Sequence, residues 1–444
     1  MGKRSAAPRS PLQAAEVLAR SGRDRGARNG DLDPSALAPG IFPSQYLSVA
    51  LAKKWISAPR GVPRQLQPAS IDLTLGRTAF RLLCSFLPDR ESGVADKLHR
   101  YAFEEFSIED GAILERNRAY LIPLNEKLAL PEAVRGRTNP KSSTGRLDIF
   151  TRVICDNNAR FDEIPFGYEG RLFLEVVPRS FLVSVSTGLS LNQLRLMTGD
   201  PGTARLLDTE LADLHLAAPI VMSNDEAVAA QDLDLAEGLF LSVDLSTDGP
   251  GHVAYRARKN SHVIDLSLTG QYSWDEFWEP VRPETGSRLI LEPEEFYLLL
   301  SRESVCVSPQ LAAEMSAYDP TAGELRTHYA GFFDPGFGYR GSSWPNGSRA
   351  TLEVRARDVP FMIEHGQRLC RLTFERLHEP AELLYGDEIG STYQDQRLTL
   401  SKHFTSQGPT GQLAFPEPHR MRRNAAVAAS ASQAAPTARV DAST

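Results

Sequence analysis

A short run of the sequence combines the residue types that bind a phosphate group. Within NPKSSTGR (139–146), the hydroxyls of Ser142 and Ser143 stand between the cations Lys141 and Arg146. Hydroxyl and backbone N–H groups can donate hydrogen bonds to phosphate oxygens while the cations neutralise their charge. Taken alone, such a run is more often a solvated basic turn, so the motif needs support from elsewhere in the chain.

A second run carries carboxylates suited to proton transfer. In FDEIPFGYEGRLFLEV (161–176), Asp162 lies in a turn and Glu175 follows on a strand among apolar neighbours. Burial would raise the pKa of the Glu175 carboxyl and suit it to move protons near neutral pH. The alternative is a half-exposed glutamate on an edge strand. Glu353, in ATLEV, is its counterpart later in the chain.

Three segments of the first half are echoed in the same order in the second half, which indicates two similar domains. The pairs are ASIDLTLG (69–76) with HVIDLSLTG (262–270), 111–131 with 288–309, and 159–176 with AGFFDPGFGYRG (330–341) followed by RATLEV (349–354). In the second of these pairs, each copy has an Ile-Leu-Glu and a tyrosine five residues after the Glu, Tyr120 in one copy and Tyr297 in the other.

These repeats predict how the chain is divided. Two domains are joined by a linker and flanked by tails rich in small and polar residues, which bury too little apolar surface to order themselves. The expected parts are a disordered tail at 1–39, a first domain at 40–200 with the phosphate loop, a linker at 201–235, a second domain at 236–405 with a C-terminal closing segment, and a disordered tail at 406–444.

The two copies differ in charge at the loop. The repeat sets DPTAGE (319–324) opposite KSSTGR, so that Asp319 replaces Lys141 and Glu324 replaces Arg146. A triphosphate would be repelled by such a loop. We therefore expect one copy to bind an anion and the other to have lost that ability, which predicts one nucleotide per chain.

The elements between the tails are mostly short apolar or alternating runs separated by Gly, Pro, Asn and Asp. Runs such as IDLTLG, RLFLEVV and FLVSVS predict a mainly β fold with few helices. Two segments have helical spacing: 44–56, with Ser44 as its N-cap, and 223–239 in the connection between the halves.

Composition excludes several classes of protein. The 444 residues carry a net charge of −7, which argues against broad binding to nucleic acid. Four scattered cysteines form no CxxC pair, which argues against both a disulfide framework and a zinc site. No apolar run approaches the ~20 residues of a membrane span, and the basic N-terminus lacks the apolar region of a secretory signal. We expect a cytoplasmic protein.

The motifs together resemble those of the dCTP deaminase family, in its longer, tandem-duplicated bacterial form. The resemblance rests on QPASIDLTLG (67–76), KSSTGR, the Asp-to-Leu-Glu hairpin, THYAGFFDPGFG (327–338), GQRLCRLTFERL (366–377) and STYQDQ (391–396), and it covers most of 40–405. It implies a mainly β architecture of two tandem dUTPase-like (β-clip) distorted barrel domains with few helices.

The resemblance also implies roles for individual residues. The triphosphate would be held by Lys141, Ser142, Ser143 and Arg146, the deoxyribose would meet Asp162 or Asp334, and the catalytic carboxylate would be Glu175 or Glu353. Tyr385, Tyr393 and Gln396 would close over the nucleotide. The chain departs from the family pattern in three places: Lys141 replaces an arginine and loses its planar fork, Thr392 replaces a lysine, and the first copy reads Asp-Glu-Ile-Pro where the second has Asp-Pro-Gly.

The implied reaction is the hydrolytic deamination of dCTP to dUTP and ammonia, which supplies dUTP for thymidylate synthesis. A carboxylate would activate the water that attacks C4 of cytosine, because the H-x-E and P-C-x-x-C patterns of zinc deaminases do not occur. Mg²⁺ would be bound through the triphosphate, without zinc. The alternatives are a dUTPase or a bifunctional dCTP deaminase and dUTP diphosphatase, and a non-catalytic nucleotide-binding regulatory protein. The resemblance further implies a homo-oligomer, trimeric or pseudo-trimeric, with dTTP as an inhibitor.

Overall fold

The computed structural model describes most of the chain between residues 32 and 405. The described ranges are 32–57, 66–89, 92–246, 251–316, 325–327, 331–341, 347–356, 358–386 and 400–405. Several predicted features lie outside them: residues 1–31 and 406–444 of the expected tails, the counterpart loop 319–324, and Thr392, Tyr393 and Gln396 of the closing segment. Residues 32–39, which were expected to belong to the disordered tail, instead contain a 3₁₀ turn at Pro34–Ala36, and Leu32 packs into the core of the first half.

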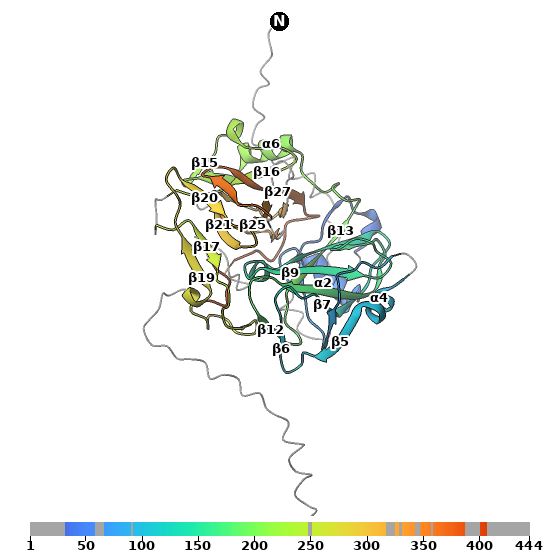
Figure 1. Cartoon of the computed structure of the whole chain (residues 1–444). Coiled ribbons are helices and arrows are strands. Elements are labelled where there is room, and N and C mark those ends of the chain that lie inside the picture. Colours follow the sequence, from blue (N-terminus) through green and yellow to red (C-terminus); the bar gives the residue numbers. More distant parts are fainter. Residues whose placement is uncertain are drawn as a thin grey trace, which may run out of the picture. The chain divides into compact units, whose positions relative to one another are not determined.

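The first half folds into two antiparallel sheets, as its alternating runs predict. One sheet has the order β1-β13-β8-β10, with β3 paired to β13, and the other has the order β5-β4-β7-β11-β9, with β2 paired to β7. Figure 1 labels β13 of the first sheet and β5, β7 and β9 of the second. Their bounds are β1 Gly40–Ile41, β2 Ile56–Ser57, β3 Ile71–Leu73, β4 Thr78–Leu82, β5 Ala102–Ser107, β7 Tyr120–Ala129, β8 Val134–Pro140, β9 Ile149–Cys155, β10 Glu163–Ile164, β11 Glu169–Pro178 and β13 Asn192–Thr198.

The second half repeats much of this arrangement. One sheet has the order β15-β14-β21-β17-β19, with β25 pairing β21 and β23, a second has the order β16-β27-β22-β24, and β20 pairs β26. Their bounds are β14 Val221–Ser223, β15 Glu226–Ala227, β16 Leu239–Ser242, β17 Ala254–Ala257, β19 Trp278–Val281, β20 Arg288–Leu291, β21 Phe296–Val305, β22 Leu311–Ser316, β23 Leu325–Thr327, β24 Phe332–Phe333, β25 Ser348–Ala356, β26 Phe361–Glu364 and β27 Arg368–Arg376. The described chain is thus mainly β with few helices, which confirms the predicted fold class.

The paired tyrosines of the sequence repeat have the same environment in both halves. Tyr120 and Tyr297 are both buried, at 0% and 1% exposure. The Tyr120 hydroxyl accepts a hydrogen bond from the backbone N–H of Glu115 (3.0 Å), and the Tyr297 hydroxyl accepts one from that of Glu292 (3.1 Å). The buried hydroxyl of each tyrosine therefore has a hydrogen-bond partner, the backbone N–H of the residue five positions before it.

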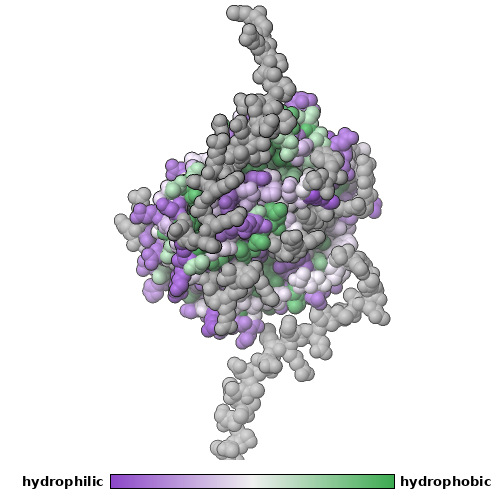
Figure 2. All heavy atoms as spheres, turned by 180° about the vertical axis from the view of Figure 1, so that it is seen from behind, coloured by the Kyte–Doolittle hydropathy of each residue, from purple (hydrophilic) through white to green (hydrophobic). Residues whose placement is uncertain are grey.

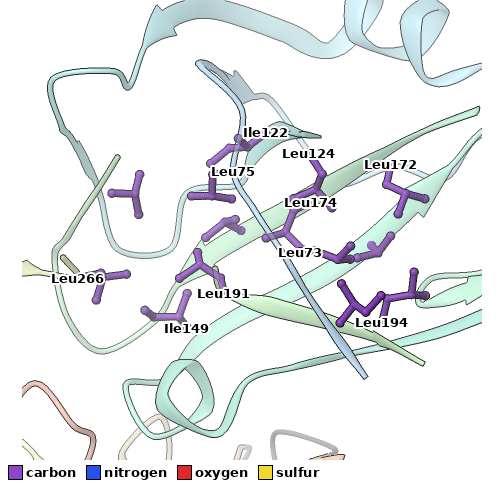
Figure 3. Close-up of a cluster of buried hydrophobic side chains, with 14 of the residues drawn as sticks. Leu73, Leu75, Ile122, Leu124, Ile149, Leu172, Leu174, Leu191, Leu194 and Leu266 are labelled. Atoms are coloured by element: carbon purple, nitrogen blue, oxygen red, sulfur yellow. The ribbon is translucent and has the colours of Figure 1, made fainter. Parts of the chain in front are cut away.

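The two halves also pack against each other. A small sheet joins them, in which β18 (Ile264–Asp265) of the second half lies parallel to β12 (Val183–Val185) of the first, with β6 (Ala112–Leu114) on the other side. Leu266 of the second half packs into the leucine-rich core of the first (Figure 3). That core includes Leu73, Leu75, Ile122, Leu124, Ile149, Leu172, Leu174, Leu191 and Leu194.

Of the two predicted helices, one is confirmed and one is wrong. Helix α2 spans Ser44–Ala52, with Pro43 rather than Ser44 at the N-cap position. The segment 223–239 instead contains the end of β14, the hairpin strand β15, a single 3₁₀ turn and the start of β16. Residues before it, in helix α6 (Asp208–Ala217) and β14, pack into the core of the second half.

The surface mixes polar and apolar residues over the face seen in Figure 2. The four cysteines are free thiols in the structure. Among the residues that the structure describes, no helix is long and apolar enough to cross a bilayer.

Candidate active site

The loop KSSTGR is built into the protein rather than exposed as a basic turn. Strand β8 leads into Lys141, whose backbone N–H donates to Leu191 O (3.0 Å), and the next residues form the one-turn helix α5 (Ser142–Gly145). Ser142 is exposed and Lys141 is half-buried, whereas the residues from Ser143 to Arg146 are buried. The loop is therefore held rigidly, with one exposed hydroxyl and two cations along it.

A carboxylate from the second half lies directly against this loop. If Gly145 carried a Cβ, that atom would lie 2.8 Å from the carboxyl carbon of Glu353 and closer still to both carboxylate oxygens. A side chain at position 145 would therefore require the Glu353 carboxylate to move. Strand β25, which carries Glu353, is an interior strand between β21 and β23, and the side chain is 9% exposed. Burial raises the pKa of Glu353 to about 8, against the opposing attraction of Arg146.

An ion pair between the halves fixes the strand that carries Glu353. Arg355, two residues along β25 and on the same face, forms an ion pair with Asp148, just beyond the loop. The fully buried Asp148 also accepts a hydrogen bond from Ser180 Oγ (2.5 Å), and it adopts a left-handed backbone conformation with φ +56°. Arg355 also donates to the backbone carbonyl of Glu294. The guanidinium thus bridges both halves next to Glu353.

Glu175, the counterpart of Glu353, has a different partner. Arg152, directly opposite on β9, donates from Nη2 (2.6 Å) and Nε (3.1 Å) to one carboxylate oxygen of Glu175. The Arg152 guanidinium also lies over the ring of Phe161, 3.6 Å from its centroid. Glu175 is fully buried on an interior strand, so burial is confirmed for both glutamates and the edge-strand alternative is wrong.

The two hairpin aspartates also differ. Asp162 stays within the first half, where its carboxylate accepts hydrogen bonds from Thr138 Oγ1 and the Val153 N–H, both at 2.8 Å. Burial raises the pKa of Asp162 to about 7. Asp334 instead reaches the first half and forms an ion pair with the fully buried Arg195 (2.8 Å).

The hairpin that carries Asp334 also contacts the one closing residue that the structure describes. Tyr385 donates its backbone N–H to Pro335 O (2.7 Å), and its ring centroid lies 5.8 Å from that of Phe337. The structure therefore brings Tyr385 to the hairpin of Asp334, and Glu353 to the loop 141–146.

Three charged residues that contact or neighbour the candidate site residues were not singled out from the sequence. Asp72 forms an ion pair with Lys141 and is 5% exposed, Arg195 binds Asp334, and Lys402 lies close enough to Asp72 and Lys141 to interact with both. Asp72 and Arg195 are charged residues within strand segments that are otherwise largely apolar, IDL and NQLRLMT. A charge at such a position could have identified them from the sequence. Burial has the largest effect on the pKa of the Asp72 carboxyl and raises it, whereas the positive charge of Lys141 lowers it.

Comparison with known proteins identifies the family. The models of the 2'-deoxycytidine 5'-triphosphate deaminase N-terminal and C-terminal domains match residues 38–200 and 207–404. A Salinispora arenicola protein named dCTP deaminase, dUMP-forming, is 32% identical over 191 residues, 42% of this chain and 90% of the relative. A Natronomonas pharaonis dCTP deaminase is 34% identical over 31% of this chain and 68% of the relative.

A solved structure agrees with these matches. The crystal structure of 2'-deoxycytidine 5'-triphosphate deaminase from Agrobacterium tumefaciens superposes with a TM-score of 0.71 and 42% sequence identity, over 76% of this chain and 99% of that one. The sequence motifs, the mainly β fold and these similarities agree, and the chain belongs to the dCTP deaminase family.

Proposed function

We propose that this protein deaminates dCTP to dUTP and ammonia at one composite site per chain, formed by the loop 141–146 and Glu353. The observation that carries the proposal is the contact between the Glu353 carboxylate and Gly145. The contact brings a buried carboxylate beside a loop that contains two cations and two serines, whereas the counterpart Glu175 is paired with Arg152.

The proposed chemistry uses one carboxylate for two proton transfers. As a water oxygen attacks C4 of cytosine, Glu353 takes a proton from the water and passes it to N3. The resulting C4 hydroxyl then gives its proton, again through Glu353, to the amino group. The C–N bond breaks, a C4 carbonyl forms and ammonia leaves, so dCTP and water become dUTP and ammonia. A carboxyl pKa near 8 suits both steps, because the group neither holds nor releases its proton too strongly near neutral pH.

The remaining side chains would bind and orient the nucleotide. Lys141, Ser142, Ser143 and Arg146 would contact the triphosphate, with Mg²⁺ carried by the phosphate oxygens and no zinc. Asp334 would meet the deoxyribose, and Tyr385, Tyr393 and Gln396 would close over the site. In this assignment Asp162 and Glu175 have structural roles, since each carboxylate is bound within the first half.

A second candidate is a bifunctional enzyme that also converts dUTP to dUMP. It is favoured by the names of several relatives, among them the Salinispora protein, which print a dUMP-forming activity. A non-catalytic nucleotide-binding protein is the third candidate. We also propose a cytoplasmic homo-oligomer, trimeric or pseudo-trimeric, that dTTP inhibits and that does not bind nucleic acid.

One assay separates these candidates. The protein is incubated with dCTP and Mg²⁺, the nucleotides are resolved by chromatography and the ammonia is measured. Accumulation of dUTP supports deamination alone, and dUMP with pyrophosphate supports the bifunctional enzyme. Binding of dCTP without either product would refute both enzymatic proposals. Calorimetric titration with dCTP should give one site per chain, and two sites would refute the composite assignment.

A further inference from the structure

The last described segment of the chain, 400–405, is fixed beside the phosphate loop. Ser401 Oγ donates a hydrogen bond to Ser143 O (2.9 Å). Three residues later, Phe404 packs in the core against the aromatic rings of Tyr272, Phe277 and Trp278. Lys402 lies between these two anchors, and its backbone carbonyl accepts a hydrogen bond from the Gly270 N–H (3.0 Å). Its position is therefore set by the surrounding fold.

The side chain of Lys402 adds a cation to a group in which Lys141 and Asp72 already form an ion pair. Burial lowers the pKa of the Lys402 ammonium most strongly, and the positive charge of Lys141 lowers it further. The negative charge of Asp72 raises it. Asp334 also acts on Asp72, and Arg195 binds Asp334. The ammonium groups of Lys141 and Lys402 thus lie in one electrostatic group with the Asp72 carboxylate.

A cavity of about 90 Å³ opens between the two lysines. Its polar lining includes Lys141, Ser143, Thr144 and Lys402, and its apolar lining includes Leu147 and Leu266. Apolar walls lower the local dielectric constant, so an anion in the cavity would be attracted more strongly than at an open surface. Two ammonium groups and three hydroxyl-bearing residues, Ser143, Thr144 and Ser190, line this space, and such a lining suits a phosphate group.

We propose that Lys402 is a further phosphate-binding residue, which with Lys141 holds the phosphate end of the ligand in this cavity. Taken as a contact to the triphosphate of dCTP, the inference rests on the proposed function. Glu353 contacts the loop at Gly145, and residues of the same loop, from Lys141 to Thr144, line the cavity.

The test is calorimetric titration of the full chain with tripolyphosphate, dCTP and deoxycytidine. Lys402→Met should weaken binding of tripolyphosphate and of dCTP about tenfold or more, because a charge-assisted contact to phosphate is lost, and should leave deoxycytidine binding unchanged. Lys402→Arg keeps the charge and should restore most of the affinity. Lys97→Met is the matched control, since Lys97 is also partly buried beside an aspartate, Asp89 (3.0 Å), but belongs to helix α4 (Val94–Tyr101).

The outcomes separate this inference from the proposed function. If Lys402→Met weakens tripolyphosphate binding but the wild type releases no ammonia from dCTP, the phosphate contact stands and the deaminase proposal fails. If the wild type does not bind tripolyphosphate, or if the Met variant binds it as well as the wild type, the inference is overturned. Equal loss of deoxycytidine and tripolyphosphate binding would also overturn it, because that pattern means structural damage. Thermal melts of all the variants, with Lys402→Arg as the folded reference, identify such damage.

Discussion

The carboxylate of Glu353 lies where a side chain on Gly145 would have to be, although the two residues come from opposite halves of the chain. Gly145→Ala should therefore displace the carboxylate, and we expect kcat for deamination to fall by about a hundredfold, since shifts near 1 Å can cost that much. The control is Gly331→Ala, because a Cβ at Gly331 would meet no atom of the described residues closer than 4.0 Å. Steady-state ammonia release measures both variants, and unchanged kcat in Gly145→Ala would contradict the proposed contact.

The two counterpart glutamates should respond differently to the same substitution. Glu353→Gln keeps the size of the side chain but removes its proton transfer, so we expect kcat to fall by about 10²–10⁴ while dCTP binding stays measurable. Glu175→Gln should leave kcat within a few-fold and lower the free energy of unfolding by roughly 1–3 kcal/mol, because the charged contact to Arg152 is weakened. Urea titration and single-turnover assays separate the two effects. The reverse pattern would make Glu175 the catalytic group.

Stability should depend on pH through Glu353. Its folded pKa of about 8 lies above the ordinary value of 4.5, so the folded chain keeps a proton that the unfolded chain releases. The stabilisation is fully present below pH 4.5 and is lost as the pH rises to about 8. We expect the free energy of unfolding of the wild type, minus that of Glu353→Gln, to fall across this window and level off above it. A difference that stayed constant with pH would show that the carboxyl is not perturbed.

The Arg355–Asp148 ion pair should position Glu353 without touching the substrate. Arg355→Met should lower kcat at least tenfold with little change in KM, because the strand that carries Glu353 loses its link to the loop. Arg349→Met is the control on the same strand β25, since Arg349 also pairs with an aspartate, Asp244, within the second half. Arg355→Lys should recover part of kcat. If the two methionine variants lose stability equally and also lose equal activity, Arg355 has only a structural role.

The enzyme should need only the Mg²⁺ that its triphosphate substrate carries. Activity should survive chelators selective for zinc. The Mg²⁺ concentration needed for full activity should rise with the dCTP concentration, because Mg²⁺ is usually held by phosphates and water. Deamination rates are measured after dialysis against each chelator, with Mg²⁺ restored as the control. Stoichiometric zinc in active protein, with loss of activity on its removal, would contradict the carboxylate mechanism.

Much of the fold could be predicted because it depends on local pattern. Alternating apolar residues gave the strands, and the shared spacing from Glu115 to Tyr120 and from Glu292 to Tyr297 corresponds to the same turn in both halves. The segment 223–239 was predicted wrongly because its alanines and acidic residues favour a helix. In the protein, Asn224 and Asp225 adopt positive φ in the turn between β14 and β15, and Glu237 does so between the bridged residues Leu235 and Leu239. Tertiary pairing overrode local propensity there.

The site was less predictable because its partners are distant in the sequence. The motif indicated Lys141 and Arg146, but neither the ion pair of Lys141 with Asp72 nor the approach of Lys402 follows from spacing. The choice between Glu175 and Glu353 also depends on contacts: Arg152 meets the first, and the loop backbone meets the second. Both glutamates have the same local sequence, Leu-Glu-Val, so only the folded chain distinguishes them.

The covalent connection between the halves has a consequence for how the site assembles. Glu353 and the loop 141–146 meet as parts of one molecule, so their encounter is governed by an effective concentration that the connecting chain fixes, and not by the amount of protein in solution. Dilution that separates one copy from another leaves this pair together. The proton-transfer group and the anion-binding loop should therefore remain paired even at the lowest concentrations in a cell.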